Sequence, residues 1–215
     1  LEFRRVLFRS GSYDEALLGQ VGDDTLTGVA GTKKRHDEFY GHEGNDIINN
    51  ASGGKSWIEA GDGNDIITGG AKEDIIRGQN GDDTIDGGNG NDIIYGGDGN
   101  DTIKTGAGDD KVYGEAGDDI IIQNGSGSQT YDGGSGTDTL KVDTSGGWST
   151  LNNSFPKFIE INSITGIVGQ VSNPNLRDTF INIENLTYVG SFDTFLTGNE
   201  QNNIILGRSE EHTSE

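Results

Sequence analysis

Aspartate recurs every nine residues through the middle of this chain. Residues 60–122 divide without a gap into seven nine-residue units, and the sixth position of every unit is Asp. Looser copies outside this tract also place Asp at the same position. Carboxylate oxygens are the ligands that hard divalent cations prefer in proteins, so these residues are candidate metal ligands. They are Asp24, Asp46, Asp65, Asp74, Asp83, Asp92, Asp101, Asp110, Asp119 and Asp138.

The other positions of each unit indicate how the chain holds these carboxylates. Position 4 is Gly in six of the seven units, with Lys72 as the exception, and a Gly at one fixed offset marks a backbone position that needs a positive φ. Position 8 is always apolar and β-branched, from Ile67 to Ile121. Positions 7 to 9 have strand propensity, and the Gly, Asn and Asp residues before them favour a turn. One unit therefore reverses the chain once, and two units, or 18 residues, close one coil.

Stacked coils of this kind predict an all-β fold, a parallel β-roll (β-solenoid) with 18 residues per coil. Strands of successive coils would lie about 4.8 Å apart, with position 8 of both sheets pointing inward as a thin aliphatic core. The composition agrees, because 37 glycines and only 30% apolar residues supply a conventional layered core poorly. We expect the array to cover residues 19–141.

Stacking places the sixth-position residues in two rows, one along each edge of the roll. The first row is Asp24, Asp46, Asp65, Asp83, Asp101, Asp119 and Asp138, and the second is Asp37, Ser56, Asp74, Asp92, Asp110 and Gln129. Carboxylates about 5 Å apart repel by several kcal/mol at an intermediate dielectric. A divalent cation between them would turn this repulsion into a net attraction.

Calcium fits this arrangement best. It takes about six to eight oxygen ligands in forgiving geometry, whereas magnesium requires a tighter octahedron and zinc prefers nitrogen or sulfur. We expect several calcium ions, at about six sites along the first edge and about two along the second, namely the pairs 74/92 and 92/110. Lys72 brings a positive charge beside the 74/92 pair and weakens that prediction.

Units such as Gly87 to Tyr95, which reads GGNGNDIIY, closely resemble the RTX, or haemolysin-type, calcium-binding nonapeptide repeat. The resemblance covers about residues 19–141, and the tandem repetition makes it specific. It implies a β-roll in a bacterial protein that leaves the cell through the type I secretion machinery and folds outside in calcium. The family's ligand Asp maps onto the sixth-position aspartates named above. The resemblance therefore implies a secreted, extracellular calcium-binding module without catalytic activity of its own.

Charge and composition exclude several other classes. With 15 basic and 36 acidic residues the 215-residue chain has a net charge of −21, which argues against nucleic acid, whose phosphates need Lys and Arg. The absence of Cys excludes disulfides and thiolate sites. No apolar run approaches the ~20 residues of a membrane span.

Other motifs are weaker. The run Asp62–Asp65 lacks the later ligands of an EF-hand loop, and Gly54–Ser56 lacks the first Gly of a phosphate-binding loop. His36 and His42 lie near acidic residues, but a solvated insertion explains them better than a transition-metal site. No nucleophile-elbow motif is present.

The two ends read as artefacts. Residues 3–10 and 208–215 can be written as translations of the two strands of one short DNA adapter, so we expect 1–10 and 208–215 to be adapter-derived and 11–207 to be a fragment of a longer chain. Residues 11–18 form a lead-in to the array.

After Lys141 the period of nine fails. Residues 142–197 contain both Pro residues and five of the eight Phe residues, and the alternations at 159–162 and 181–184 predict half-exposed strands. This region either caps or extends the roll as irregular β structure, or forms a small β domain of its own. Residues 198–207, together with Ile183–Leu186, look like degenerate repeats. The sequence leaves three alternatives for the role of this chain in its parent protein. It is a folding and secretion module, a module of an RTX enzyme (a protease, lipase or epimerase) whose catalytic domain lies elsewhere, or a spacer of an RTX adhesin.

Overall fold

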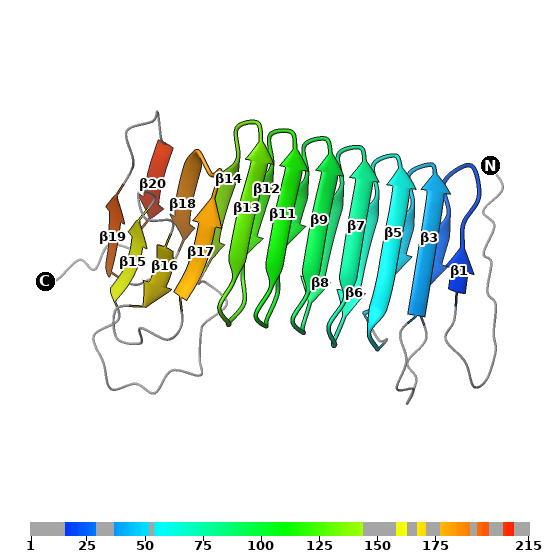
Figure 1. The fold of residues 1–215 in the computed structure, drawn as a ribbon, viewed down its shortest axis with the longest axis horizontal. Coiled ribbons are helices and arrows are strands. Elements are labelled where there is room, and N and C mark those ends of the chain that lie inside the picture. Colours follow the sequence, from blue (N-terminus) through cyan, green and yellow to red (C-terminus); the bar gives the residue numbers. More distant parts are fainter. Residues whose placement is uncertain are drawn as a thin grey trace, which may run out of the picture.

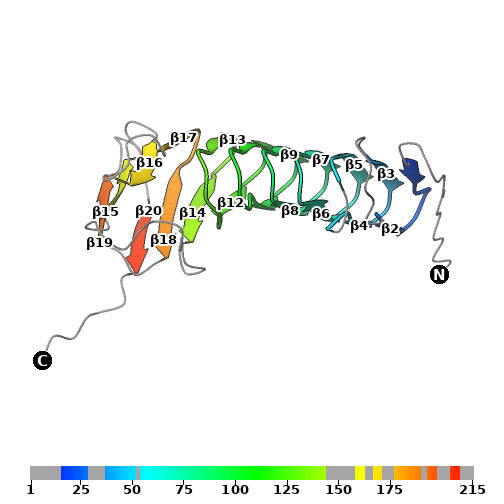
Figure 2. The same ribbon diagram turned by 90° about the horizontal axis from the view of Figure 1, so that it is seen from below.

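The computed structural model describes residues 16–28, 37–51, 54–143, 158–162, 167–170, 177–189, 193–197 and 204–208. Within these ranges the chain is all β and contains no helix. The strands alternate between two sheets along the chain, and the chain winds as a flattened coil whose two sheets lie face to face (Figures 1 and 2). The predicted parallel β-roll is confirmed.

Odd-numbered strands of the array form one sheet and even-numbered strands the other. The 11-stranded sheet has the order β1 (Ala16–Leu18), β3 (Asp37–Glu43), β5 (Ser56–Asp62), β7 (Ile75–Asn80), β9 (Ile93–Asp98), β11 (Lys111–Ala116), β13 (Thr130–Ser135), β17 (Arg177–Ile181), β16 (Ile167–Gln170), β15 (Phe158–Asn162) and β19 (Asp193–Thr197). The 9-stranded sheet has the order β2 (Thr25–Thr27), β4 (Ile47–Asn49), β6 (Ile66–Gly70), β8 (Thr84–Gly88), β10 (Thr102–Lys104), β12 (Ile120–Gln123), β14 (Thr139–Asp143), β18 (Asn185–Val189) and β20 (Ile204–Arg208).

Strand pairing follows the predicted coil length. In the 9-stranded sheet Ile85 pairs with Ile67 on one side and with Ile103 on the other, so each step is 18 residues. The strands are parallel throughout the array, and the two antiparallel pairings, β15–β16 and β16–β17, belong to the downstream region. Identical positions of every second unit therefore lie side by side on one sheet.

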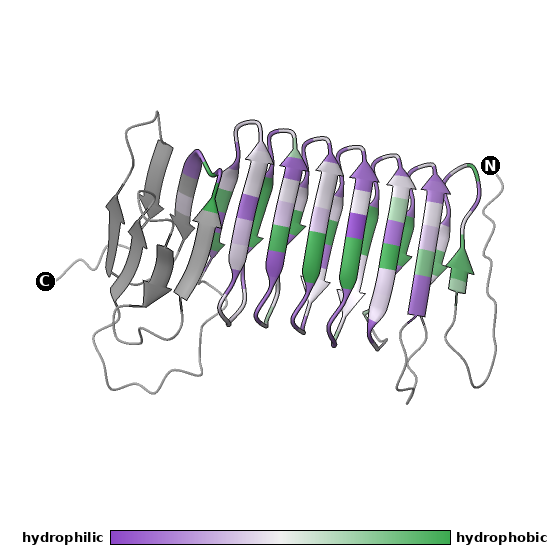
Figure 3. Cartoon of the chain, viewed as in Figure 1, coloured by the Kyte–Doolittle hydropathy of each residue, from purple (hydrophilic) through white to green (hydrophobic). Residues whose placement is uncertain are grey.

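Most of the core is the inward row that position 8 contributes to each sheet, and Ala60, Val142 and Ile183 add to it. Every position-8 side chain from Leu17 to Leu140 is at most 1% exposed. Burying each of these side chains contributes about 1.5–3 kcal/mol, and one such residue per half-coil is a modest core. Figure 3 shows the same division, with a hydrophobic band across the strands and hydrophilic turns at their ends.

The turns require the glycines at position 4. Gly63 has a φ of 134° and Gly81 a φ of 128°, a region that L-residues with a Cβ rarely adopt. Lys72, at the same position of its unit, does not adopt a positive φ. The turn at residues 71–74 therefore has a different backbone conformation from the other turns.

Side chains on the outer face of the 11-stranded sheet form a continuous stack. The Arg77 guanidinium lies 4.7 Å from the ring centroid of Trp57 and 4.9 Å from that of Tyr95. The ring of Tyr95 stacks in turn on Tyr113, with centroids 4.9 Å apart and planes within 11°. Cation–π and stacking contacts thus connect four successive strands, β5 to β11.

Both sheets continue past residue 143. Strand β17 pairs with β13, and β18 pairs with β14, so the chain rejoins the roll one coil further on (Figure 2). The predicted strand at 159–162 is confirmed as β15. The predicted strand at 181–184 is wrong, because Asn182 has a φ of 51° and turns the chain at the corner between β17 and β18. Both Pro residues, Trp148 and the N-terminal segment predicted to be an artefact lie outside the described residues, and the domain boundaries remain predictions.

Candidate metal sites along the two edges

The sixth-position aspartates lie in two rows, as predicted. The first edge is the row of turns that follows the strands of the 11-stranded sheet, at the top of Figure 1. The second edge is the row of turns that follows the strands of the 9-stranded sheet. All ten candidate aspartates are at most 6% exposed. Such burial of ionisable side chains is unusual and requires polar partners.

One oxygen of each carboxylate bonds to the preceding coil. In the centre of the first edge the main-chain N–H of Asp65 donates to Oδ1 of Asp83, and that of Asp83 donates to Oδ1 of Asp101, both at 2.8 Å. The same bond recurs at every step of this edge from Asp24 to Asp138, with distances of 2.7–2.9 Å. These bonds fix the orientation of each carboxyl group.

The other oxygen has no protein partner in most of these groups. The Oδ2 atoms concerned are buried and make no hydrogen bond, and they belong to Asp46, Asp65, Asp83, Asp92, Asp101, Asp110, Asp119 and Asp138. Six of the eight lie on the first edge and two on the second. A buried acceptor left unpaired costs about 1–3 kcal/mol, and more when it is charged. The array thus repeats one unfavourable feature at regular intervals, which points to a ligand.

Six of the eight unpaired oxygens lie beside a main-chain carbonyl of the next coil, next to a Gly at position 1. A Cβ added at Gly78 would collide with Oδ2 of Asp83 and with the carbonyl oxygen of Gly96. A Cβ added at Gly96 would meet Oδ2 of Asp101 and the carbonyl oxygen of Gly114 in the same way. Position 1 of these units is therefore restricted to Gly, because a carboxylate oxygen and a carbonyl oxygen converge on the space that a side chain would fill.

Burial changes the protonation of these carboxyl groups. It raises the pKa of Asp83 and Asp92 to about 8 and that of Asp101 to about 7. The hydrogen bond from the preceding coil opposes this shift, and the charges of neighbouring aspartates add to it. The pKa values of Asp65 and Asp138 are raised to about 6 for the same reasons. Without a cation these carboxyl groups therefore take up protons at a higher pH than exposed aspartates do.

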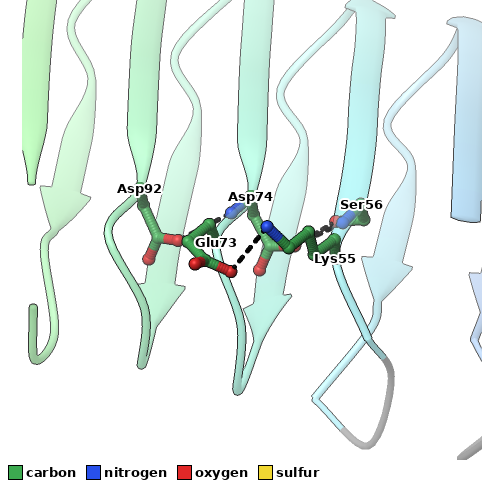
Figure 4. A network of polar contacts seen from close by, with 5 residues as sticks. All are labelled: Lys55, Ser56, Glu73, Asp74 and Asp92. Atoms are coloured by element: carbon green, nitrogen blue, oxygen red, sulfur yellow. Dashed lines mark hydrogen bonds and ion pairs between the residues drawn. The ribbon is translucent and has the colours of Figure 1, made fainter. Parts of the chain in front are cut away.

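On the second edge, both carboxylate oxygens of Asp74 have protein partners, and Ser56 of the preceding coil is one of them (Figure 4). The main-chain N–H and the hydroxyl of Ser56 donate to Oδ1 of Asp74 at 2.6 and 2.8 Å. The N–H of Gly70 donates to Oδ2 of Asp74 at 2.7 Å, so neither oxygen is unpaired. Alongside, Nζ of Lys55 lies 3.0 Å from a carboxylate oxygen of Glu73. Polar contacts within the protein hold this step together.

The far end of the second edge has an amide in place of a carboxylate. The N–H of Asp110 donates to Oε1 of Gln129 at 3.2 Å, which is the bond that an Asp accepts elsewhere. Gln129 thus keeps the hydrogen-bond pattern without the charge. At the start of the first edge Oδ2 of Asp24 already accepts the N–H of Gln20 at 2.6 Å.

Sequence analysis missed the role of position 5. Its Asn and Asp side chains form an exposed row outside each row of sixth-position residues, in which Asn64 Oδ1 accepts the N–H of Asp82 (3.0 Å) and Asp82 Oδ1 accepts that of Asn100 (2.7 Å). The signal was present, because this position is Asn or Asp in six of the seven units and Glu73 in the other. Positions 5 and 6 thus bond neighbouring coils in opposite directions along the chain.

Glu184 is a second residue that sequence analysis missed. Its Oε2 accepts the main-chain N–H of Asp138 at 2.7 Å, across a separation of 46 residues. Glu184 therefore occupies the next place in the row of the first edge. The signal was the degenerate repeat at 183–186, where Glu stands two residues before Leu186 in the way that Asp precedes the position-8 residue.

The donor set fits calcium better than other metals. In the described part of the chain no three His, Asp or Glu side chains converge, so a metal must use main-chain oxygens in addition to one or two carboxylates. Carbonyl and carboxylate oxygens without nitrogen or sulfur suit a hard cation that accepts many oxygen ligands. His42, which lies in β3, is not part of such a group. The orphaned oxygens beside glycine carbonyls are therefore a reasonable fit for calcium.

The fold and the edges together define a parallel β-roll with oxygen-lined turns, a class of calcium-dependent repeat structure. Residues 34–54, 59–94 and 95–122 match the family model of the RTX calcium-binding nonapeptide repeat, in four copies. These segments belong to that family. A comparison with curated proteins finds no significant match. Among the described residues no helix has the length and hydrophobicity to cross a membrane.

Proposed function

We propose that residues 19–141 bind several calcium ions between neighbouring coils and that this binding drives folding of the roll outside a bacterial cell. The observation that carries the proposal is the row of buried carboxylate oxygens without a protein partner, one per coil step. Membership of the RTX repeat family supports calcium as the ion.

The individual steps are not equivalent as candidate sites. The strongest are the pairs 46/65, 65/83, 83/101, 101/119 and 119/138 on the first edge and 92/110 on the second, because each combines two carboxylates with an unpaired Oδ2. The pairs 24/46 and 74/92 are weaker. At these two steps the Oδ2 atoms of Asp24 and Asp74 already accept main-chain N–H groups, from Gln20 and Gly70.

Folding and binding are one process in this proposal. A metal-free roll would bury a row of like charges or take up protons against their solution preference, whereas the unfolded chain leaves the carboxylates in water. A chain with 36 acidic residues and 30% apolar residues stays unfolded where calcium is scarce and folds where calcium is abundant. This behaviour suits passage through the type I secretion machinery followed by folding in the extracellular medium.

We assign a binding role and no reaction to this region. The side chains along both edges bond main-chain groups of neighbouring coils and direct single oxygens inward, an arrangement that suits a cation and not a substrate. A catalytic domain or an adhesive domain would have to lie elsewhere in a longer parent chain.

Circular dichroism in a calcium titration tests this function. We expect little strand signal in chelator, full strand signal in millimolar calcium, and a weak response to the same concentration of magnesium, with recovery of the unfolded signal on chelation. Full strand signal in chelator at neutral pH would contradict the coupling of binding to folding.

A further inference from the structure

The first edge does not end with the nine-residue repeat. Asp138 is its last sixth-position Asp, and the chain then leaves the array and returns through β17 and β18. At the return, the N–H groups of Glu184 and Asn185 donate to the carbonyl oxygen of Asp138 at 3.1 and 2.8 Å. The N–H of Asp138 donates to Oε2 of Glu184 at 2.7 Å. The returning corner is therefore held against the last turn of the array.

This corner rebuilds the geometry of an interior step. Asp138 is fully buried, and its Oδ2 has no hydrogen-bond partner. A Cβ added at Gly133 would collide with Oδ2 of Asp138 and with the carbonyl oxygen of Asn182. One coil earlier, a Cβ added at Gly114 would meet Oδ2 of Asp119 and the carbonyl oxygen of Gly133. The same two oxygens thus converge at both steps.

The chain reaches this arrangement by a different route. In the interior the carbonyl and the next carboxylate come from positions 1 and 6 of one unit, five residues apart. At the corner they come from Asn182 and Glu184, two residues apart, where the positive φ of Asn182 tightens the turn. The longer Glu side chain takes the place of Asp. No nonapeptide pattern spans this corner, so the likeness lies in the geometry.

We propose that Asp138, Glu184 and the carbonyl oxygen of Asn182 form a further calcium site that joins the array to the downstream region. The proposal rests on the proposed function, because it treats the unpaired oxygen of Asp138 as equivalent to those of the interior steps. The ligands are oxygens only, which suits a hard divalent cation. Binding at this site fixes the first coil after the insertion on the last coil of the repeat array.

The test compares the full chain with Glu184→Gln and with the control Glu43→Gln. Gln keeps an acceptor for the N–H of Asp138, as Gln129 does for Asp110, so the substitution removes charge while leaving the hydrogen bond. Glu43 is exposed and lies at the far end of the roll, in β3. Native mass spectrometry counts the bound calcium ions, and hydrogen exchange follows the amides of β18 and β12.

We expect Glu184→Gln to bind one calcium ion fewer than the unaltered chain and Glu43→Gln to bind the same number. Calcium should protect the β12 amides in all three proteins, but should no longer protect the β18 amides in Glu184→Gln. An unchanged ion count with unchanged protection of β18 would overturn the proposal.

Two further results distinguish a failure of the proposed function from a failure of the site at Glu184. An unaltered chain that binds no calcium refutes the proposed function itself, whereas normal binding by both the unaltered chain and Glu184→Gln refutes only the site at Glu184. If Glu184→Gln does not fold in calcium, Glu184→Asp decides, because it retains a carboxylate. Glu184→Asp must bind the full number of ions, and a folded Glu184→Asp with one ion fewer also overturns the site.

Discussion

Oδ1 of Asp83 accepts the main-chain N–H of Asp65 at 2.8 Å, while Oδ2 of the same carboxyl group is buried and unpaired. One oxygen therefore maintains the stacking of the coils, and the other is available to a cation. The two roles can be separated by substitutions that keep the first oxygen and change the second.

Asp83→Asn should have opposite effects with and without calcium. In calcium it removes a ligand shared by two steps, and we expect a loss of about 3–4 kcal/mol, the contribution of an ion at about 100 to 1,000 times its Kd. In chelator at pH 8 it should stabilise residual roll, because the amide needs no proton on burial. Urea unfolding in calcium measures the first effect, and the residual strand signal by circular dichroism in chelator measures the second. Asp86→Asn, in β8 and pointing away from the edges, is the control; a loss of stability in both media would contradict the assignment of Oδ2 to a cation.

The metal-free roll should gain stability on acidification. Burial raises the pKa of Asp83 and Asp92 to about 8 from an ordinary value of 3.8, so the folded state binds protons more tightly than the unfolded chain. The resulting stabilisation is complete below about pH 4 and is lost as the pH rises towards about 8. Circular dichroism of calcium-free protein between pH 5 and pH 8 should show strand signal increasing as the pH falls. A signal that increases with pH would contradict this protonation equilibrium.

In calcium the dependence on pH should be weak between pH 6 and pH 8. The aspartates of the unfolded chain have an ordinary pKa of 3.8, and those that hold calcium carry no protons, so folding in calcium exchanges almost no protons in this range. The calcium concentration at the folding midpoint, measured by circular dichroism, should therefore be no higher at pH 6 than at pH 8. A midpoint several-fold higher at pH 6 would show that calcium displaces protons from a roll that is already folded.

Gln129→Glu should create a site where the natural chain has an incomplete one. Oδ2 of Asp110 is buried and unpaired, and Gln129 supplies an acceptor without charge at the position of the second carboxylate. The variant should bind one more calcium ion than the natural chain and be more stable in calcium, with lower stability in chelator because a further like charge is added. Native mass spectrometry provides the count. Gln79→Glu, at an exposed position near the end of β7, adds the same charge and should leave the count unchanged.

Arg77 should contribute stability that does not depend on calcium. Its guanidinium lies between the rings of Trp57 and Tyr95 and is only 3.9 Å from a carboxylate oxygen of Glu59. Arg77→Ala should lower the free energy of unfolding in calcium by about 1–2 kcal/mol, given about 0.5–1 kcal/mol per partly exposed cation–π contact. The ion count should not change. Lys104→Ala, on the exposed outer face of β10, is the control. Equal effects of the two substitutions would show that the stack contributes nothing to the free energy of unfolding.

The period of nine predicted the features that each unit determines locally. The inward direction of Ile76 and Ile94, and the positive φ of Gly81, follow from strand alternation and turn chemistry within a few residues. The looser copies were equally informative, since Phe39 and Tyr131 are fully buried in the same inward rows. Local rules sufficed here because a repeat places identical neighbours on both sides of every unit.

Features that depend on distant pairing were not predictable. Glu184 reaches Asp138 only after an insertion whose length follows no period, so the degenerate repeat at 183–186 did not indicate which coil Glu184 would meet. Oδ2 is paired in Asp74 and unpaired in Asp92, and this difference depends on which N–H and O–H groups reach each carboxylate. The sequence suggested a weak 74/92 pair because of Lys72, whereas the structure points to the hydroxyl of Ser56 and the N–H of Gly70 as partners of Asp74.

The 18-residue stagger between β5 and β12 leaves the centre of the roll with an ambiguity in alignment. A displacement by one whole coil would again set Ile against Ile and Asp against Asp, at almost no cost in the core or along the edges. The non-repeating side chains remove this degeneracy, because Arg77 meets an aromatic ring on both sides in only one alignment, and Ser56 meets Asp74 in only one. Departures from the consensus therefore act as alignment marks, and a roll made of perfectly identical units would lack them.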